Sequence, residues 1–149
     1  MSTWPYRSLC YTDWLNEYMT NPSPVTAECF ERMVREAAAG GADALVFNPN
    51  GQSVIYPSDV WQTMWGRYAK DPATAFGTLA EDETECVEEH EAVLKDMRDL
   101  AAAGCDAMDV VTEACRREGL DCCISLRMND THGHQWGACY LVSDFYFQH

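Results

Sequence analysis

Basic residues are scarce in this chain of 149 residues. It has 10 lysines and arginines against 24 aspartates and glutamates, which gives a formal net charge of −14 at pH 7. A surface of this sign repels phosphate backbones and anionic lipid headgroups. We therefore expect neither a nucleic acid nor a membrane surface as a partner.

Long apolar runs, a signal sequence and zinc-type cysteine spacing are also lacking. No run approaches the roughly 18 apolar residues that span a bilayer, and the amino terminus has no basic region followed by an apolar stretch. None of the eight cysteines forms a Cys-x-x-Cys pair, and most of them lie in apolar segments, where a thiol packs as a small hydrophobe. These absences predict a soluble, cytoplasmic protein with free thiols and no cofactor.

Apolar residues, at 47% of the chain, are numerous enough for one folded domain. Short β-prone segments at 6–11, 43–48 and 121–127 predict three strands. Helical periodicity at 26–39, 85–103 and 108–118 predicts the long crossovers that parallel strands require, and glycines follow the helices that precede the second and third strands. We therefore predict an α/β fold in which residues 1–149 form a partial (β/α) barrel domain.

Aromatic residues are concentrated between the second strand and the 85–103 helix. Val60, Trp61, Met64, Trp65 and Tyr68 recur at helical spacing after Ser58. Such a stripe is more often a packing surface than a ligand platform. We interpret it as one face of a helix that begins near Ser58.

Polar residues follow each predicted strand, and in parallel α/β folds functional groups gather at the carboxyl ends of strands. The richest of these segments runs from Arg127 to His134. Arginine and asparagine side chains donate hydrogen bonds to hydroxyl oxygens, aspartate accepts them, and histidine exchanges a proton near neutral pH. We predict two catalytic residues, Asp130 and His132, and a set of substrate-binding residues: Arg127, Asn129, Asn48, Asn50, Asp13, Tyr11 and His134.

Other interpretations of the same residues stay open. Asn129 to His132 is also ordinary turn chemistry, with Asp130 capping local amides. His132 and His134 are spaced so that both can reach one metal ion, although no further ligands are evident. A glycosidase needs two carboxylates across the scissile bond, for which Asp130 and Asp13 are the candidates.

Two stretches resemble a known group of proteins. Residues 125–132, Ser-Leu-Arg-Met-Asn-Asp-Thr-His, preceded by Arg-Arg-Glu-Gly-Leu at 116–120, resemble the third-strand region of an uncharacterised family of glycoside-hydrolase-like (β/α)8 barrels. Residues 41–48, Gly-Ala-Asp-Ala-Leu-Val-Phe-Asn, resemble its second strand. The similarity runs along most of the chain and is specific mainly at 127–132. It implies a TIM-type barrel acting on carbohydrate and supplies no catalytic residues.

The chain is short for such a barrel, which needs roughly 250 residues. We therefore expect the amino-terminal part of a barrel, a fragment whose open sheet edge invites self-association. The first hypothesis is a glycoside-hydrolase-like, carbohydrate-active protein with its site at the strand carboxyl ends. The alternatives are a non-catalytic carbohydrate-binding or self-assembling module, and a metal-dependent hydrolase or sugar isomerase that uses His132 and His134.

Overall fold

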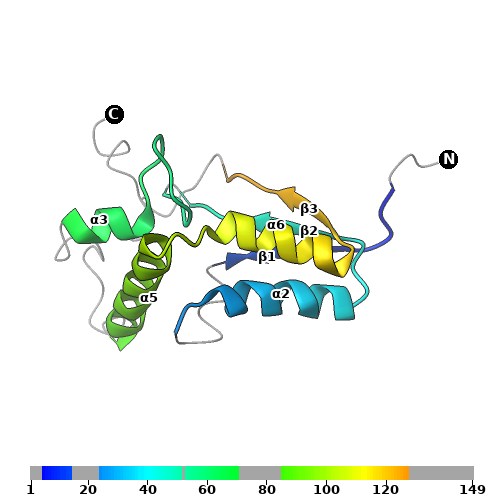
Figure 1. The fold of residues 1–149 in the computed structure, drawn as a ribbon, viewed down its shortest axis with the longest axis horizontal. Helices are drawn as coiled ribbons and strands as arrows, with labels where there is room; N and C mark the ends of the chain where they lie inside the picture. Colours follow the sequence, from blue (N-terminus) through cyan, green and yellow to red (C-terminus); the bar gives the residue numbers. More distant parts are fainter. Residues whose placement is uncertain (1–4, 15–23, 52, 71–84, 128–149) are drawn as a thin grey trace.

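A computed structural model describes residues 5–14, 24–51, 53–70 and 85–127. Along the chain these residues form seven elements (Figure 1): β1 (Leu9–Asp13), α2 (Ala27–Ala39), β2 (Ala44–Asn48), α3 (Met64–Lys70), α5 (Glu85–Ala102), α6 (Ala107–Glu118) and β3 (Asp121–Ile124). The predicted mixture of strands and helical crossovers is confirmed. Among the described helices, none has the length and apolarity that crossing a membrane demands.

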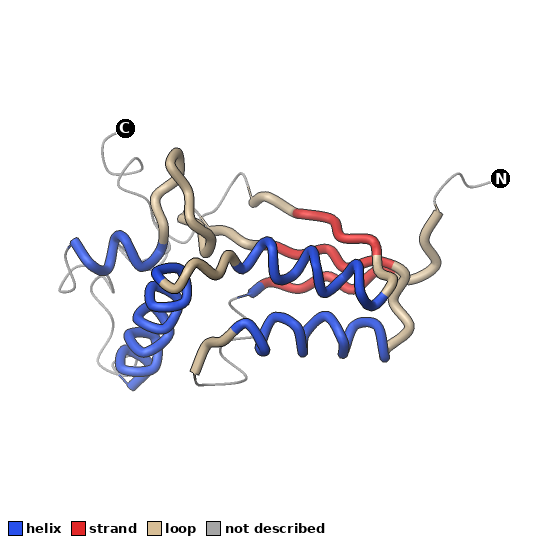
Figure 2. Tube along the Cα trace, in the orientation of Figure 1, coloured by secondary structure: helices blue, strands red, loops and turns tan. Residues whose placement is uncertain are grey.

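The three strands form one parallel sheet in the order β1-β2-β3. Leu45 in β2, the middle strand, is in register with Cys10 on one side and Cys122 on the other. Helices α2 and α6 lie side by side along the same face of this sheet (Figures 1 and 2). Sequential parallel strands with crossover helices on one face are typical of the start of a (β/α) barrel. Closure into a complete barrel remains a proposal.

The strand bounds differ from the predicted ones at both edges of the sheet. β1 begins at Leu9, because the amides of Arg7 and Ser8 donate to the carboxylate of Asp43, at 2.7 Å and 3.0 Å. β3 ends at Ile124, although the Ser125 amide still donates to the Phe47 carbonyl at 2.8 Å. The Asp43 side chain therefore takes over from strand pairing at the start of β1, which apolar patterning does not reveal.

Left-handed glycines follow the helices that lead into β2 and β3. Gly41 has a φ of 81° and Gly119 a φ of 74°. The amide of Gly119 donates to the Cys115 carbonyl, so this glycine ends α6 and turns the chain toward β3. A left-handed residue is strained unless it is glycine. The repeated order of helix, glycine and strand in the sequence therefore has a direct structural cause.

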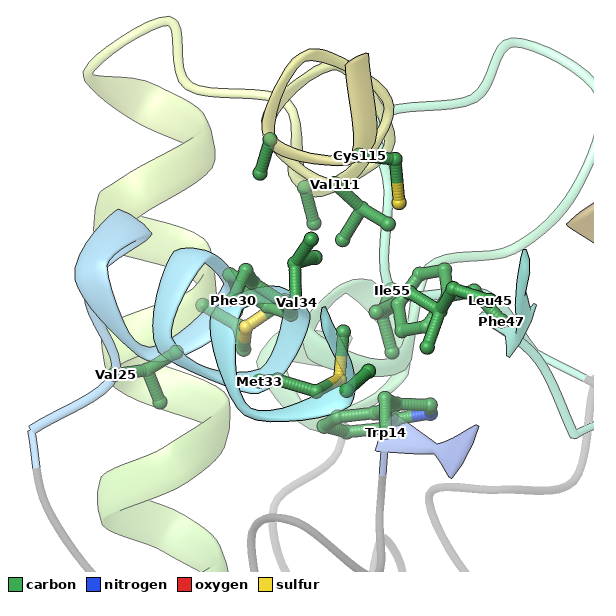
Figure 3. Packing of buried hydrophobic residues seen from close by; sticks show 14 of the residues in the cluster. Trp14, Val25, Phe30, Met33, Val34, Leu45, Phe47, Ile55, Val111 and Cys115 are labelled. Carbon is green, nitrogen blue, oxygen red and sulfur yellow. The ribbon is translucent and has the colours of Figure 1, made fainter. Parts of the chain in front are cut away.

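The core lies between the sheet and the α2–α6 layer (Figure 3). Val34 and Val111 from the two helices and Leu45 and Phe47 from β2 are buried in it. The rings of Phe30 and Phe47 meet edge to face, with centroids 6.5 Å apart. α5 adds Leu94 and Met97 to the same core.

Cysteines pack in this core or beside it. Burial raises the pKa of the Cys115 thiol to about 12, and the neighbouring Cys122 adds to the shift. A thiol with so high a pKa stays protonated at neutral pH and behaves as an apolar side chain. The cysteines whose side chains the structure describes are free thiols: Cys10, Cys29, Cys105, Cys115, Cys122 and Cys123.

The sheet face that points away from α2 and α6 is partly exposed. Side chains alternate along a strand, so Tyr11, Val46 and Cys123, which are register partners, form a row on this face. Tyr11 is 57% exposed, and Leu9, on the same face, is exposed as well. In a barrel this face lines the interior, where side chains from further strands pack against such residues and cover them.

Candidate functional site

The carboxyl edge of the sheet brings together four of the predicted site residues: Asp13, Asn48, Asn50 and Arg127. Asp13 ends β1, Asn48 ends β2, and the two are register partners. Arg127 follows the end of β3 and reaches back to Asp13. This convergence follows from parallel pairing, because the carboxyl ends of all three strands meet at one edge (Figure 1).

An ion pair between Arg127 and Asp13 is the central contact of the site. The Nη2 atom of Arg127 donates to Oδ2 of Asp13. Since β2 lies between β1 and β3, this pair bridges the two outer strands across the end of the middle one. The Asp13 side chain is 12% exposed and that of Arg127 is 32% exposed. The pair is therefore largely desolvated, while the guanidinium stays within reach of a ligand.

Asn50 holds the backbone of Arg127 in place. Its Oδ1 accepts from the Arg127 amide at 2.9 Å, and its Nδ2 donates to the Arg127 carbonyl at 3.2 Å. The same Nδ2 also donates to the carbonyl of Gly51, at 2.6 Å. The amide side chain thus replaces a strand partner for Arg127, three residues past the end of β3. We define these bonds between Asn50 and Arg127 as the Asn50 clamp.

Asn48 and Asn50 were both predicted to contact substrate, and both are buried. Oδ1 of Asn48 accepts from the Asn50 amide at 3.3 Å, a local turn that sets the direction of the chain after β2. Both donor hydrogens of the Asn50 amide go to backbone carbonyls. These two residues therefore position the site, and direct substrate contact by either one stays a prediction.

Tyr11 lies two residues before Asp13 and on the same face of β1. Its side chain is more than half exposed. A ligand above Asp13 and Arg127 would meet this phenol as the next layer of the sheet face. Its predicted role in binding is compatible with this position.

The segment after β2 corrects one interpretation made from the sequence. The helix that was expected to begin near Ser58 is α3, which begins at Met64. Ser58 instead accepts bonds from the amides of Val60 and Trp61 through its Oγ, which forms a separate turn before the helix. Met64 is buried, as expected for packing, whereas Trp61 lies outside the helix and is 39% exposed. The only sequence signal for this difference is Pro57 beside Ser58, a pair typical of turns.

Several predicted residues lie outside the described part of the chain. They are Asn129, Asp130, His132 and His134. Two of them, Asp130 and His132, are the predicted catalytic residues. Among the described side chains, no group of three or more His, Cys, Asp or Glu residues is arranged to hold a metal ion. The catalytic pair and the His132–His134 metal hypothesis therefore stay predictions.

Comparison with known proteins finds no protein-family model that matches the chain and no significant match among curated proteins. The functional argument thus depends on the geometry at the carboxyl edge of the sheet.

Proposed function

We propose that this chain carries a carbohydrate site of the glycoside-hydrolase-like type at the carboxyl edge of its parallel sheet. The observation that carries the proposal is the Asp13–Arg127 ion pair, which lies across the end of β2. Vicinal hydroxyl groups of a sugar need an acceptor and a donor side by side, and a carboxylate beside a guanidinium offers both. Tyr11 adds an exposed ring on the same face of the sheet.

We further propose that the site hydrolyses the carbohydrate that it binds. Asp130 and His132 follow Arg127 by three and five residues, so the chain that leaves the Asn50 clamp carries them. Asp130 as a proton donor and Asp13 as a second carboxylate would form the pair that glycoside hydrolysis requires. His132 would move protons near neutral pH. The resemblance of residues 125–132 to glycoside-hydrolase-like barrels supports this assignment.

The decisive variant is Arg127→Ala. It removes the guanidinium but keeps the backbone amide and carbonyl that the Asn50 clamp holds, so the local fold is expected to persist. Loss of a hydrogen bond from a charged group costs about 2 kcal/mol, or roughly 30-fold in affinity. Titration calorimetry with a panel of mono- and oligosaccharides measures this loss.

Arg117→Ala is the matched control. Arg117 pairs with Glu31 at 2.7 Å and joins α6 to α2, away from the carboxyl ends of the strands, so this variant is expected to bind as the unaltered protein does. Equal sugar affinity in Arg127→Ala and Arg117→Ala would refute the site. Failure of the unaltered chain to bind any sugar in the panel would refute the carbohydrate assignment itself.

A second candidate is a module that assembles with further copies of itself and binds without catalysis. The observation that favours it is the exposed apolar surface of Leu9 and Tyr11 on the sheet face opposite the helices. Exposed apolar sheet faces and open edges favour association. Sedimentation velocity over a range of protein concentrations tests this association.

A further inference from the structure

Asn50 and Gly51 form the single Asn-Gly pair in the chain. In such a pair the backbone nitrogen of the glycine can attack the side-chain carbonyl carbon of the asparagine, because glycine has no side chain to shield this nitrogen. An asparagine that precedes proline, such as Asn48, cannot react in this way, since proline has no amide hydrogen to lose. The sequence therefore makes Asn50 the asparagine most prone to lose its side-chain amide.

The reaction is a cyclisation followed by hydrolysis. A bond forms between the Gly51 nitrogen and Cγ of Asn50, the bond from Cγ to Nδ2 breaks, and ammonia leaves with the proton of the Gly51 amide. Water then opens the cyclic imide at either of its carbonyl groups. The product is aspartate, or isoaspartate, in which the main chain passes through Cβ and Cγ. Water is the only co-reactant, and no atom is oxidised or reduced.

The fold holds both reacting groups away from this reaction. Asn50 is 2% exposed, and Gly51 is buried as well. The Gly51 amide donates to the Ser53 carbonyl at 3.0 Å, which keeps its proton in a hydrogen bond. The Asn50 clamp fixes the carboxamide on Arg127, and Nδ2 also donates to the Gly51 carbonyl at 2.6 Å. Cyclisation releases Nδ2 and removes the Gly51 proton, so both sets of hydrogen bonds must open first.

We infer that Asn50 is a deamidation site controlled by the Asn50 clamp: it stays asparagine while Arg127 is held and converts when the clamp opens. This inference goes beyond the proposed carbohydrate site and does not depend on it, since it needs only the carboxamide and the backbone of Arg127. An ionised aspartate has no hydrogen to donate to the carbonyls of Arg127 and Gly51. Isoaspartate adds a main-chain atom where Asn50 pairs with Val54. Opening therefore leaves a permanent mark on the chain, which afterwards holds Arg127 less tightly.

Peptide mapping by mass spectrometry of the full chain, incubated in mildly alkaline buffer, tests the inference. Conversion adds the mass difference between a hydroxyl and an amino group at residue 50, and an isoaspartyl methyltransferase assay measures the isoaspartate form. A synthetic peptide of residues 46–55 in the same buffers gives the rate of the unprotected pair. The folded chain should convert at least about 30-fold more slowly than the peptide, because opening breaks two hydrogen bonds to partly buried groups. Across a urea series its rate should rise with the fraction of opened chains.

Arg127→Pro and Arg127→Ala are the matched variants, because proline lacks the amide from which Oδ1 of Asn50 accepts, whereas alanine keeps it. Circular dichroism establishes that both are folded. Arg127→Pro should then convert about 5-fold faster than Arg127→Ala, the change expected from the loss of one hydrogen bond. Equal rates in the two folded variants would overturn the inference. If Arg127→Pro unfolds, the unaltered chain decides: a rate equal to that of the peptide, or one that does not rise through the urea transition, overturns the inference as well.

Discussion

At the scale of single residues, Asn50 has a larger structural role than its place in a polar turn implies. It bonds both backbone groups of a residue 77 positions later in the sequence. Few side chains can do this, because the task needs an acceptor and a donor side by side in one plane, as in a carboxamide. Asparagine therefore joins β2 to the end of β3 where backbone pairing stops.

Asn50→Ala is expected to destabilise the protein by about 2 kcal/mol, because it removes two hydrogen bonds to partly buried backbone groups of Arg127. Denaturant unfolding followed by circular dichroism measures this change. Asn50→Asp keeps an acceptor for the Arg127 amide but loses both donor bonds, so its stability should lie near that of the alanine variant. An unfolding free energy unchanged in Asn50→Ala would show that the clamp contributes nothing to stability.

Sequence reasoning found the residues of the carboxyl edge but not how their roles divide. Asp13, Asn48 and Arg127 could be predicted, because each follows a strand and parallel strands end together. The burial of Asn50 could not be predicted, because it depends on a partner far along the chain. Trp61 fits the helical spacing of its neighbours, but its amide donates to Ser58 Oγ in a turn and the helix begins only at Met64.

At the scale of elements, Asp43 fixes the start of the sheet. It precedes β2, and its carboxylate accepts from the amides of Arg7 and Ser8 just before β1. These bonds, first that of Arg7 and then that of Ser8, hold the pKa of Asp43 below its ordinary value of 3.8. The amino end of β1 therefore depends on a charged group rather than on apolar contacts alone.

The pKa of Asp43 predicts how stability responds to acid. Its pKa is lower in the folded than in the unfolded chain, so its contribution is complete above the unfolded value and is lost as pH falls through the folded value. Asp43→Asn should melt at a lower temperature than the unaltered protein at about pH 7, and the gap should narrow by about pH 3. Thermal unfolding across this range measures it.

Asp99→Asn is the control for this pH effect. The pKa of Asp99 is also lowered, chiefly by the neighbouring Arg98, but this carboxylate lies on the exposed side of α5 and joins no two elements. Exposed pairs of this kind contribute little to stability. A gap for Asp43→Asn that stays constant with pH, or one equal to that of Asp99→Asn, would contradict the prediction.

The elements themselves could largely be predicted, and their edges could not. The glycines at 41 and 119 marked the entries to β2 and β3 because each needs a left-handed backbone. The start of β1 differed from the prediction because a side chain, Asp43, took over from strand pairing there. Periodicity reports which face of an element is buried, and it carries no information about such replacements.

At the scale of the whole molecule, the sheet is covered by helices on one face and shows apolar residues on the other. The parallel α/β class is confirmed by the strand order. A closed TIM-type barrel requires strands beyond the three described, and the apolar row of the open face has the character of a barrel interior. The described residues show a parallel three-stranded sheet with its helices, and the barrel itself stays a prediction.

The exposed sheet face predicts that the chain associates with copies of itself. The exposed residues Leu9 and Tyr11 should make the chain associate as its concentration rises, which sedimentation velocity measures. Leu9→Glu should shift the equilibrium toward monomer, because it places a charge on the open face and adds to a net charge of −14. Val60→Glu adds the same charge at an exposed apolar position elsewhere and should associate normally. A chain that is monomeric throughout, or equal behaviour of the two variants, would exclude association through this face.

Parallel pairing also has a consequence for the order in which the chain folds. Ser8 and Asp43, at the β1–β2 junction, are 35 residues apart, whereas Asn50 and Arg127, at the β2–β3 junction, are 77 apart. Closing the longer loop costs more entropy, and contacts between distant residues slow folding. We expect the β1–α2–β2 unit to form first on a chain leaving the ribosome, with the outer edge of β2 unpaired until β3 has been synthesised. During that interval a chaperone or a second nascent chain would meet the backbone of Leu45 and Phe47.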